Sequence, residues 1–180
     1  MTAHPSVLES MRGRITTVNS TDDRVELIAR NIQKGRISPL VHIFASQALT
    51  DRCGDAWCVA EKDWTGEIQQ IGAHIRRTIR YTLDTHNIDT YRTPDRTIQL
   101  ALGDCDDMVA LAGSVLQAVG YPILIKVIQM EGEPDFHHIY LMTGTPPENP
   151  QDWIAVDATQ PQPVGYEPPG IIDHRHYTVN

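Results

Sequence analysis

The chain has 180 residues, of which 41% are hydrophobic and 21% charged, and these values are typical of a soluble globular domain with its own core. Its formal net charge of −8 argues against sequence-independent binding to nucleic acid or to an anionic membrane surface, because both need a basic patch. No stretch is long and apolar enough to span a bilayer, and residues 1–10 lack the apolar core of a signal peptide. We therefore expect no nucleic-acid or membrane partner, and a cytoplasmic protein or one released by lysis or by a partner.

Three regions of the chain differ in composition. Residues 1–20 are polar, show little periodicity and are expected to form a flexible arm. Residues 21–160 are expected to form a single domain. Residues 161–180 open with P-Q-P-V-G-Y-E-P-P-G, and their proline content predicts an extended tail without regular secondary structure.

The first part of the domain has the apolar spacing of helices. Residues 20–22 offer N-caps for a helix that ends near Gly35, Ser38-Pro39 can open a second helix, and Asp63 can cap a third. Residues 83–97 are predicted to be a loop. Three arginines at the end of the third helix are most simply a solvated face: Arg76, Arg77 and Arg80.

Three cysteines are too few for a disulfide framework, and an odd number leaves at least one free thiol. Cys53 and Cys58 lie in C-G-D-A-W-C, which has no second cysteine pair to complete a structural zinc site. These two side chains either form a local disulfide in an oxidising setting or are ordinary packed thiols. The packed thiols are the favoured interpretation.

The stretch L-G-D-C-D-D-M-V-A has the pattern of a helix N-terminus. Asp104 is a good N-cap, so Cys105 falls at the first helical position, and Asp106 and Asp107 lie in the first turn, where the helix dipole favours carboxylates. The helix that follows is apolar on most of its circumference and ends at Gly120, so we expect it to be buried.

Three strands are predicted after this helix, at residues 123–130, 136–142 and 153–159. The loops between them are short, which favours an antiparallel sheet. The sequence therefore predicts an α+β fold, in which a helical N-terminal half is followed by the buried helix of Cys105 packed on an antiparallel sheet.

A cysteine at a helix N-terminus, followed by a histidine and an aspartate on neighbouring strands, is a pattern used in nucleophilic catalysis. The helix dipole and a histidine are expected to lower the pKa of the Cys105 thiol below its usual value. The histidine is either His137 or His138, which alternate to opposite faces of the strand. Asp157 on the next strand is placed to orient it.

A metal site is the other interpretation of the aspartates around Cys105 and of the histidine pair. One soft ligand among several hard ones suits no common metal well, so we expect neither a metal nor a cofactor. The pair His174 and His176 near the C-terminus is a weak metal signal, most simply a solvated end. Tyr81 either belongs to the core or lines a cleft.

Three blocks of sequence resemble the transglutaminase-like superfamily: G-D-C-D-D-M-V-A-L-A-G-S-V-L-Q-A-V-G-Y-P, then H-H-I-Y-L, then W-I-A-V-D-A-T. The family pattern is a G-x-C helix that ends in G-[IY]-P, an H-x-[WY] strand and a W-x-x-x-D-x-T strand. The resemblance covers roughly residues 64–160 and implies a papain-like core. The acidic G-D-C-D-D version looks most like small stand-alone domains from bacteria and tailed bacteriophages.

The resemblance implies a catalytic triad. Cys105 would be the nucleophile, His138 the general base and acid, and Asp157 the residue that orients His138. The H-x-[WY] register selects His138 over His137, with Tyr140 two residues further on. The backbone N–H of Cys105 would contribute to an oxyanion hole.

Two functions follow from this resemblance. The first is a cysteine acyl-transfer enzyme that acts on an amide of a protein or peptide substrate, as a peptidase, an amidase or an amine transferase. The alternative is a non-catalytic virion or tail-assembly component, in which the fold is a docking module and the termini contact phage structural subunits. The expected location is accordingly cytoplasmic or virion-associated.

Overall fold

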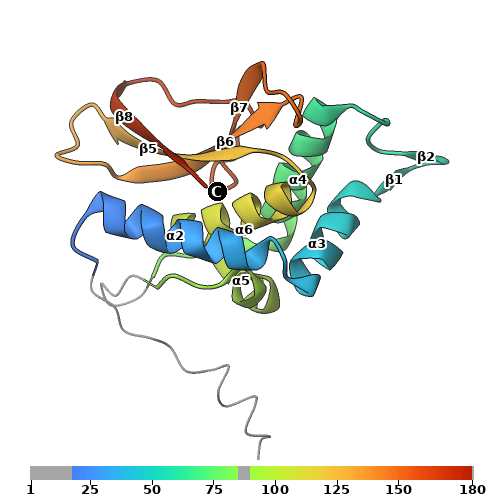
Figure 1. Ribbon diagram of the computed structural model, residues 1–180, viewed down its shortest axis with the longest axis horizontal. Helices are drawn as coiled ribbons and strands as arrows, with labels where there is room; N and C mark the ends of the chain where they lie inside the picture. The colour runs from blue at the N-terminus through green and yellow to red at the C-terminus, as the bar shows by residue number, and fades with distance from the viewer. Residues whose placement is uncertain (1–17, 85–89, 180) are drawn as a thin grey trace, which may run out of the picture.

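The computed structural model describes residues 18–84 and 90–179, and it has the expected α+β architecture. A layer of helices packs under one face of a four-stranded antiparallel sheet (Figure 1). The predicted arm at residues 1–20 lies almost wholly outside the described residues, as do residues 85–89 of the predicted loop. Within the described ranges, no helix is both long enough and apolar enough to cross a membrane.

The helices begin at the caps that the sequence predicts. Ser20, Ser38 and Asp63 each accept a hydrogen bond from a backbone N–H in the first turn. The helices are α2 (Thr21–Gly35), α3 (Pro39–Leu49), α4 (Trp64–Thr78), α5 (Pro94–Leu100) and α6 (Cys105–Ala118). The prediction of a loop through residue 97 was wrong at its end, because Pro94 opens α5 and proline is favoured at the first position of a helix.

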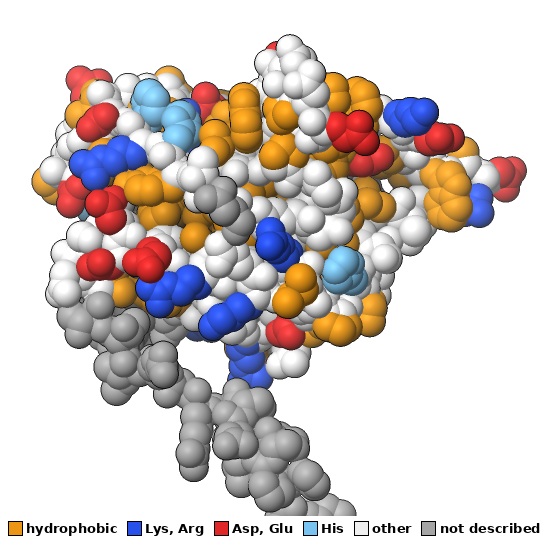
Figure 2. Space-filling model, in the orientation of Figure 1, with side chains coloured by type: hydrophobic (Ala, Val, Ile, Leu, Met, Phe, Trp, Pro, Cys, Tyr) orange, Lys and Arg blue, Asp and Glu red, His pale blue; other side chains and the backbone are white. Residues whose placement is uncertain are grey.

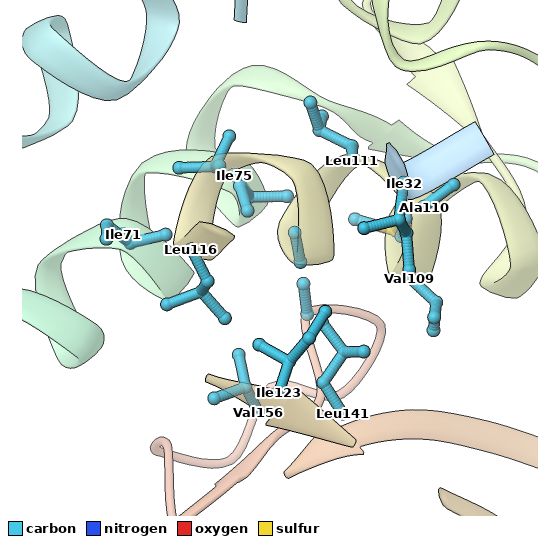
Figure 3. Close-up of a cluster of buried hydrophobic side chains, with 14 of the residues drawn as sticks. Ile32, Ile71, Ile75, Val109, Ala110, Leu111, Leu116, Ile123, Leu141 and Val156 are labelled. Carbon is cyan, nitrogen blue, oxygen red and sulfur yellow. The ribbon is translucent and has the colours of Figure 1, made fainter. Parts of the chain in front are cut away.

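Helix α6 is the centre of the domain. It contacts α2, α3, α4 and α5 on its sides and β6 of the sheet above. Figure 3 shows Leu111 and Leu116 of α6 among side chains of α2, α4 and the sheet, including Ile32, Ile75 and Leu141. All five side chains are fully buried, so this one helix carries the packing of both layers.

The sheet has the strand order β7-β6-β5-β8, and every neighbouring pair is antiparallel. Its strands are β5 (Ile123–Met130), β6 (His138–Thr145), β7 (Asp152–Val156) and β8 (Ile171–Thr178). Strands β6 and β7 lie close to their predicted positions. Alternate residues face α6, and the opposite face carries a second small cluster: Ile128, Tyr140, Met142 and Ala155.

The prediction that residues 161–180 lack regular secondary structure was wrong for their second half. Strand β8 pairs with β5 along its length, although it follows a proline-rich segment. The prolines end at Pro169, and the residues after them are free to donate hydrogen bonds to a sheet edge.

The proline-rich segment connects β7 to β8. These strands are the two opposite edges of the sheet, so the segment must cross the sheet. Glu167 in this segment accepts hydrogen bonds from Tyr140 Oη at 2.5 Å and from Lys126 Nζ. Both donors lie on the face away from α6, so the segment covers part of that face. Lys126 is thereby buried as an ion pair rather than as a lone charge.

A small hairpin projects from the helical layer between α3 and α4 (Figure 1). It consists of β1 (Arg52–Cys53) and β2 (Ala56–Trp57). In the space-filling view, hydrophobic side chains lie beside a basic side chain at this edge of the molecule (Figure 2). Cys53 and Cys58 form a disulfide, so the favoured interpretation as packed thiols was wrong. Gly54 at φ 72° allows the tight turn that brings the two Cα atoms to 4.8 Å.

Truncation of Leu111 tests the central role of α6. Leu111→Ala should lower the free energy of unfolding by about 2–5 kcal/mol, because it removes a fully buried side chain and leaves a cavity. Urea denaturation measures the change. Leu83→Ala is the control, because Leu83 is 75% exposed and its truncation should change stability by no more than about 0.5 kcal/mol. Equal losses in the two variants would contradict this packing.

The disulfide predicts how many thiols react. Denatured protein treated with iodoacetamide without reductant should gain one carbamidomethyl group, at Cys105, and three groups after reduction. Peptide mass spectrometry locates the labels. Labelling of all three cysteines without reduction, in protein purified under oxidising conditions, would contradict the disulfide.

Candidate active site

Cys105 is the first residue of α6, as the sequence predicts. Asp104 is the N-cap, and its Oδ1 accepts a hydrogen bond from Asp107 N at 3.2 Å. The side chain of Asp107 reaches back to Asp104 N at 3.4 Å, which completes a capping box. This reciprocal pairing fixes the backbone on both sides of Cys105.

The aspartates of the first turn hold two other parts of the chain. Arg24 of α2 donates from Nε and Nη2 to the Asp106 carboxylate at 2.9–3.1 Å. Arg92 donates from its backbone N–H to Asp107 Oδ1 at 2.7 Å and forms an ion pair with the same carboxylate. Both carboxylates are buried, so a paired arginine offsets the cost of removing each from water.

The environment of Cys105 raises the pKa of its thiol to about 12, mainly through burial and then through the charge of Asp106. Arg24 opposes this shift, with Nη2 at 3.8 Å from Sγ. The thiol itself lies 3.7 Å from Asp106 Oδ1. The expectation of a lowered pKa was therefore wrong for the unliganded protein, because burial and the neighbouring carboxylates outweigh the favourable helix end.

His138 and Asp157 form a close pair at the end of the sheet. His138 Nε2 lies 2.6 Å from Asp157 Oδ2, and Thr159 donates to Oδ1 of the same carboxylate from its backbone N–H and its hydroxyl. Burial raises the pKa of the Asp157 carboxyl, but the hydrogen bonds and the His138 charge outweigh it and hold this pKa below its usual value. The imidazole is thus oriented by an ionised carboxylate.

The structure distinguishes the two histidines. His137 is half exposed and lies 3.4 Å from Glu133, whereas His138 is mostly buried against Asp157. The ring of His138 also lies 5.8 Å from the ring of Tyr140, on the same face of β6. Within residues 18–84 and 90–179, no hydrogen bond joins His138 to Cys105, and Sγ contacts Arg24 and Asp106 instead.

Tyr81 links the two halves of the site. Its strand β3 (Arg80–Tyr81) runs parallel to β4 (Leu102–Gly103), directly before α6. Burial raises the pKa of its phenol, and the charges of Cys105 and Asp157 both add to this shift. Tyr81 also lines a hollow of about 260 Å³ with Met108 of α6 and Thr159 beside Asp157. Of the two interpretations of Tyr81, as a core residue or as part of a cleft, the second is therefore the one that the structure supports.

The ligand atoms of Asp104, Cys105 and Asp106 lie within 4.8 Å of one another and form a possible cation site. The Asp106 carboxylate already binds the Arg24 guanidinium, which supplies the positive charge that a cation would bring. Burial and the Asp107 charge raise the pKa of Asp104 to about 7. The three possible ligands are therefore the Asp106 carboxylate, which is already bound to Arg24, the Asp104 carboxyl, which is about half protonated near pH 7, and the Cys105 thiol.

Arg24 and Arg92 are the residues of this site that sequence reasoning missed. Arg24 lies 82 positions from its partner Asp106 and has no local motif. The only available signal was the unbalanced acidity of D-C-D-D, which requires cations nearby once the helix is buried.

No family model matches the chain, and no curated protein matches it in sequence. Among solved structures, it is similar to a candidate cysteine protease from Cytophaga hutchinsonii, with a TM-score of 0.52 and 17% identity over 81% of this chain and 45% of that one. Calcium-bound Legionella pneumophila LapG gives a TM-score of 0.48 with 16% identity over 96% of this chain and 84% of that one. A TGase gives 0.44 with 13% identity over 86% and 36%.

The first of these similarities, together with the α+β core, defines the fold class. The chain has the transglutaminase-like fold, with a papain-like core in which the cysteine begins the central helix. It spans less than half the length of the Cytophaga hutchinsonii protein.

Removing the negative or the positive partner of the Arg24–Asp106 ion pair should shift the pKa of the Cys105 thiol in opposite directions. Asp106→Asn should lower the thiol pKa, because it removes a neighbouring negative charge, and Arg24→Gln should raise it, because it removes the opposing positive charge. The pH dependence of Cys105 alkylation, read by mass spectrometry, measures both. Arg77→Gln disrupts an ion pair with Asp51 elsewhere and should leave the profile unchanged. Shifts of the same sign in the Asp106 and Arg24 variants would contradict this account.

Proposed function

We propose that the chain is a transglutaminase-like cysteine enzyme that transfers the acyl group of an amide, with Cys105, His138 and Asp157 as its triad. The observation that carries the proposal is the 2.6 Å hydrogen bond between His138 Nε2 and Asp157 Oδ2. Residues that follow Asp157, Ala158 and Thr159, line one hollow with Met108 in the first turn of α6. Acyl transfer requires a carboxylate-oriented imidazole and a helix-terminal cysteine that meet at the bound substrate.

The tautomer of His138 follows from its partner. Because the Asp157 carboxylate accepts a hydrogen bond, Nε2 carries the proton and Nδ1 is left unprotonated. Nδ1 is then the atom that takes the thiol proton. Asp157 stabilises the resulting imidazolium through its negative charge.

The reaction begins with attack of Cys105 Sγ on the carbonyl carbon of the amide, while the Sγ proton moves to His138 Nδ1. The carbonyl oxygen becomes an oxyanion, and the Cys105 backbone N–H at the start of α6 donates to it. The C–N bond then breaks, and His138 returns the proton to the leaving amine. Water or a second amine attacks the thioester, loses its proton to His138 and releases Cys105.

The raised thiol pKa determines when the proton moves. At neutral pH Cys105 rests as a thiol against Arg24 and Asp106, so the free enzyme holds no standing thiolate–imidazolium pair. Proton transfer to His138 therefore accompanies attack on the bound substrate. Catalytic hydrogen bonds are often long in unliganded enzymes and shorten when substrate binds.

A protein or peptide substrate is the proposed partner, by analogy with the candidate protease from Cytophaga hutchinsonii. The docking-module alternative loses one of its supports, because β8 pairs within the domain rather than extending toward another subunit. The disulfide also favours an oxidising setting over the cytoplasm.

Labelling by a substrate-like electrophile tests the triad. A peptidyl acyloxymethyl ketone should alkylate Cys105, and His138→Ala should slow this reaction by about 100-fold or more, the usual range for loss of a general base. His137→Ala is the matched control and should react at the wild-type rate. Mass spectrometry gives the second-order rate constants.

The same rates are measured with EDTA and with added calcium, because the Asp104, Cys105 and Asp106 ligand atoms lie close together. A Cys105 that reacts with iodoacetamide but not with the peptidyl probe under either condition would overturn the proposed function. A probe rate that is indifferent to His138 would overturn the triad.

A further inference from the structure

The hollow that Tyr81 and Met108 line has a composition that the proposed chemistry does not explain. It lies between the end of α4, the first turns of α6 and the residues that follow Asp157. Its walls include apolar atoms of Ile79 and Met108 and two cations, Arg76 and Arg80. A catalytic thiol and imidazole have no need of two arginines on this side.

These two arginines differ from the third arginine of the same helix end. Arg77 forms an ion pair with Asp51 at 2.9 Å, on the outside of the helix. Neither Arg76 nor Arg80 forms an ion pair with a carboxylate anywhere in residues 18–84 and 90–179. Arg76 Nη1 is also buried, and it has no hydrogen-bond acceptor within those same ranges.

An unpaired buried donor in a cleft wall costs free energy unless a ligand satisfies it. Arg76 lies in the last turn of α4 and Arg80 in β3, and both line the hollow, so their like charges repel unless an anion lies between or beside them. The expectation that the three arginines are a solvated face holds for Arg77 and Arg80, which are exposed, but not for Arg76, which is partly buried.

Arginines elsewhere in the site already have carboxylate partners. Arg24 binds Asp106, and Arg92 binds Asp107 and Asp84. Arg76 and Arg80 are the cations of this cleft that no carboxylate of residues 18–84 or 90–179 neutralises, in a chain whose formal net charge is −8.

We propose that this hollow is a substrate subsite in which Arg76 and Arg80 bind the carboxylate of an aspartate or glutamate near the amide that Cys105 attacks. The proposal rests on the proposed function and names its substrate class: acidic protein or peptide segments. The apolar walls from Ile79 and Met108 accommodate the methylene groups of such a side chain. A basic side chain in the same position is repelled.

A binding measurement tests the subsite without catalysis. Fluorescein-labelled hexapeptides that contain two glutamates, two glutamines or two lysines are titrated with Cys105→Ala protein, and anisotropy gives the dissociation constants. The glutamate peptide should bind at least about fivefold more tightly than the glutamine peptide, which is the scale of an exposed charge pair. Adding Arg76→Gln and Arg80→Gln should abolish this preference, and adding Arg77→Gln should preserve it. Equal binding of the three peptides, or a preference that survives loss of Arg76 and Arg80, would overturn the subsite.

Labelling with matched probes separates the subsite from the function. Acyloxymethyl ketones with glutamate or glutamine beside the reactive group are compared on the wild-type chain, on Arg80→Glu and on Arg77→Gln. The glutamate probe should react faster with the wild type, and Arg80→Glu should reverse the order. Equal labelling of Cys105 by the two probes would overturn the subsite and leave the function standing. Arginine-dependent binding of the glutamate peptide, without labelling by either probe, would support the subsite and overturn the function.

Discussion

The site depends on the neutralisation of three carboxylates packed around the first turn of α6. Asp104 turns inward to cap its own helix, Asp106 holds α2 through Arg24, and Asp107 holds the segment before α5 through Arg92. A buried carboxylate that loses its partner costs about 3–5 kcal/mol, so each of these contacts is also a tether. The acidic sequence around the cysteine is thus a structural device that aligns three parts of the chain with one helix end.

This device has a chemical cost and a chemical benefit. Burial, and then the charge of Asp106, keep Cys105 protonated in the free protein, which protects the thiol from oxidation and from chance electrophiles, because the thiolate is the reactive form. The same contacts fix the backbone N–H groups at the start of α6, where an oxyanion would form. An unreactive thiol in the free protein is compatible with a preorganised oxyanion site. The reactivity of the thiol depends on Sγ of Cys105, whereas the oxyanion site depends on the backbone N–H groups at the start of α6.

Local signals in the sequence predicted the parts of the fold that local chemistry determines. The caps Ser20, Asp63 and Asp104 and the buried helix of Cys105 were identified because each rests on neighbouring residues. Strand β8 was missed because its partner β5 lies far away in sequence and the prolines before it dominated the interpretation. Arg24 was missed for the same reason, since only the folded chain brings it to Asp106. The pairing of His138 with Asp157 could be anticipated through family motifs, whereas parity alone left His137 open.

The position of β8 has a consequence for how the chain matures. Strand β5 has β6 on one side and β8 on the other, and β8 ends at Thr178. On the ribosome, β5 therefore waits with one edge unpaired until β6, β7 and the whole crossover have been made. Tyr177 hydrogen-bonds Asp22 of α2 at 2.6 Å, across a separation of 155 residues. The edge of β5 that β8 covers stays open until β8 has been made, so the nascent protein carries an exposed strand edge that chaperones or partner strands can bind.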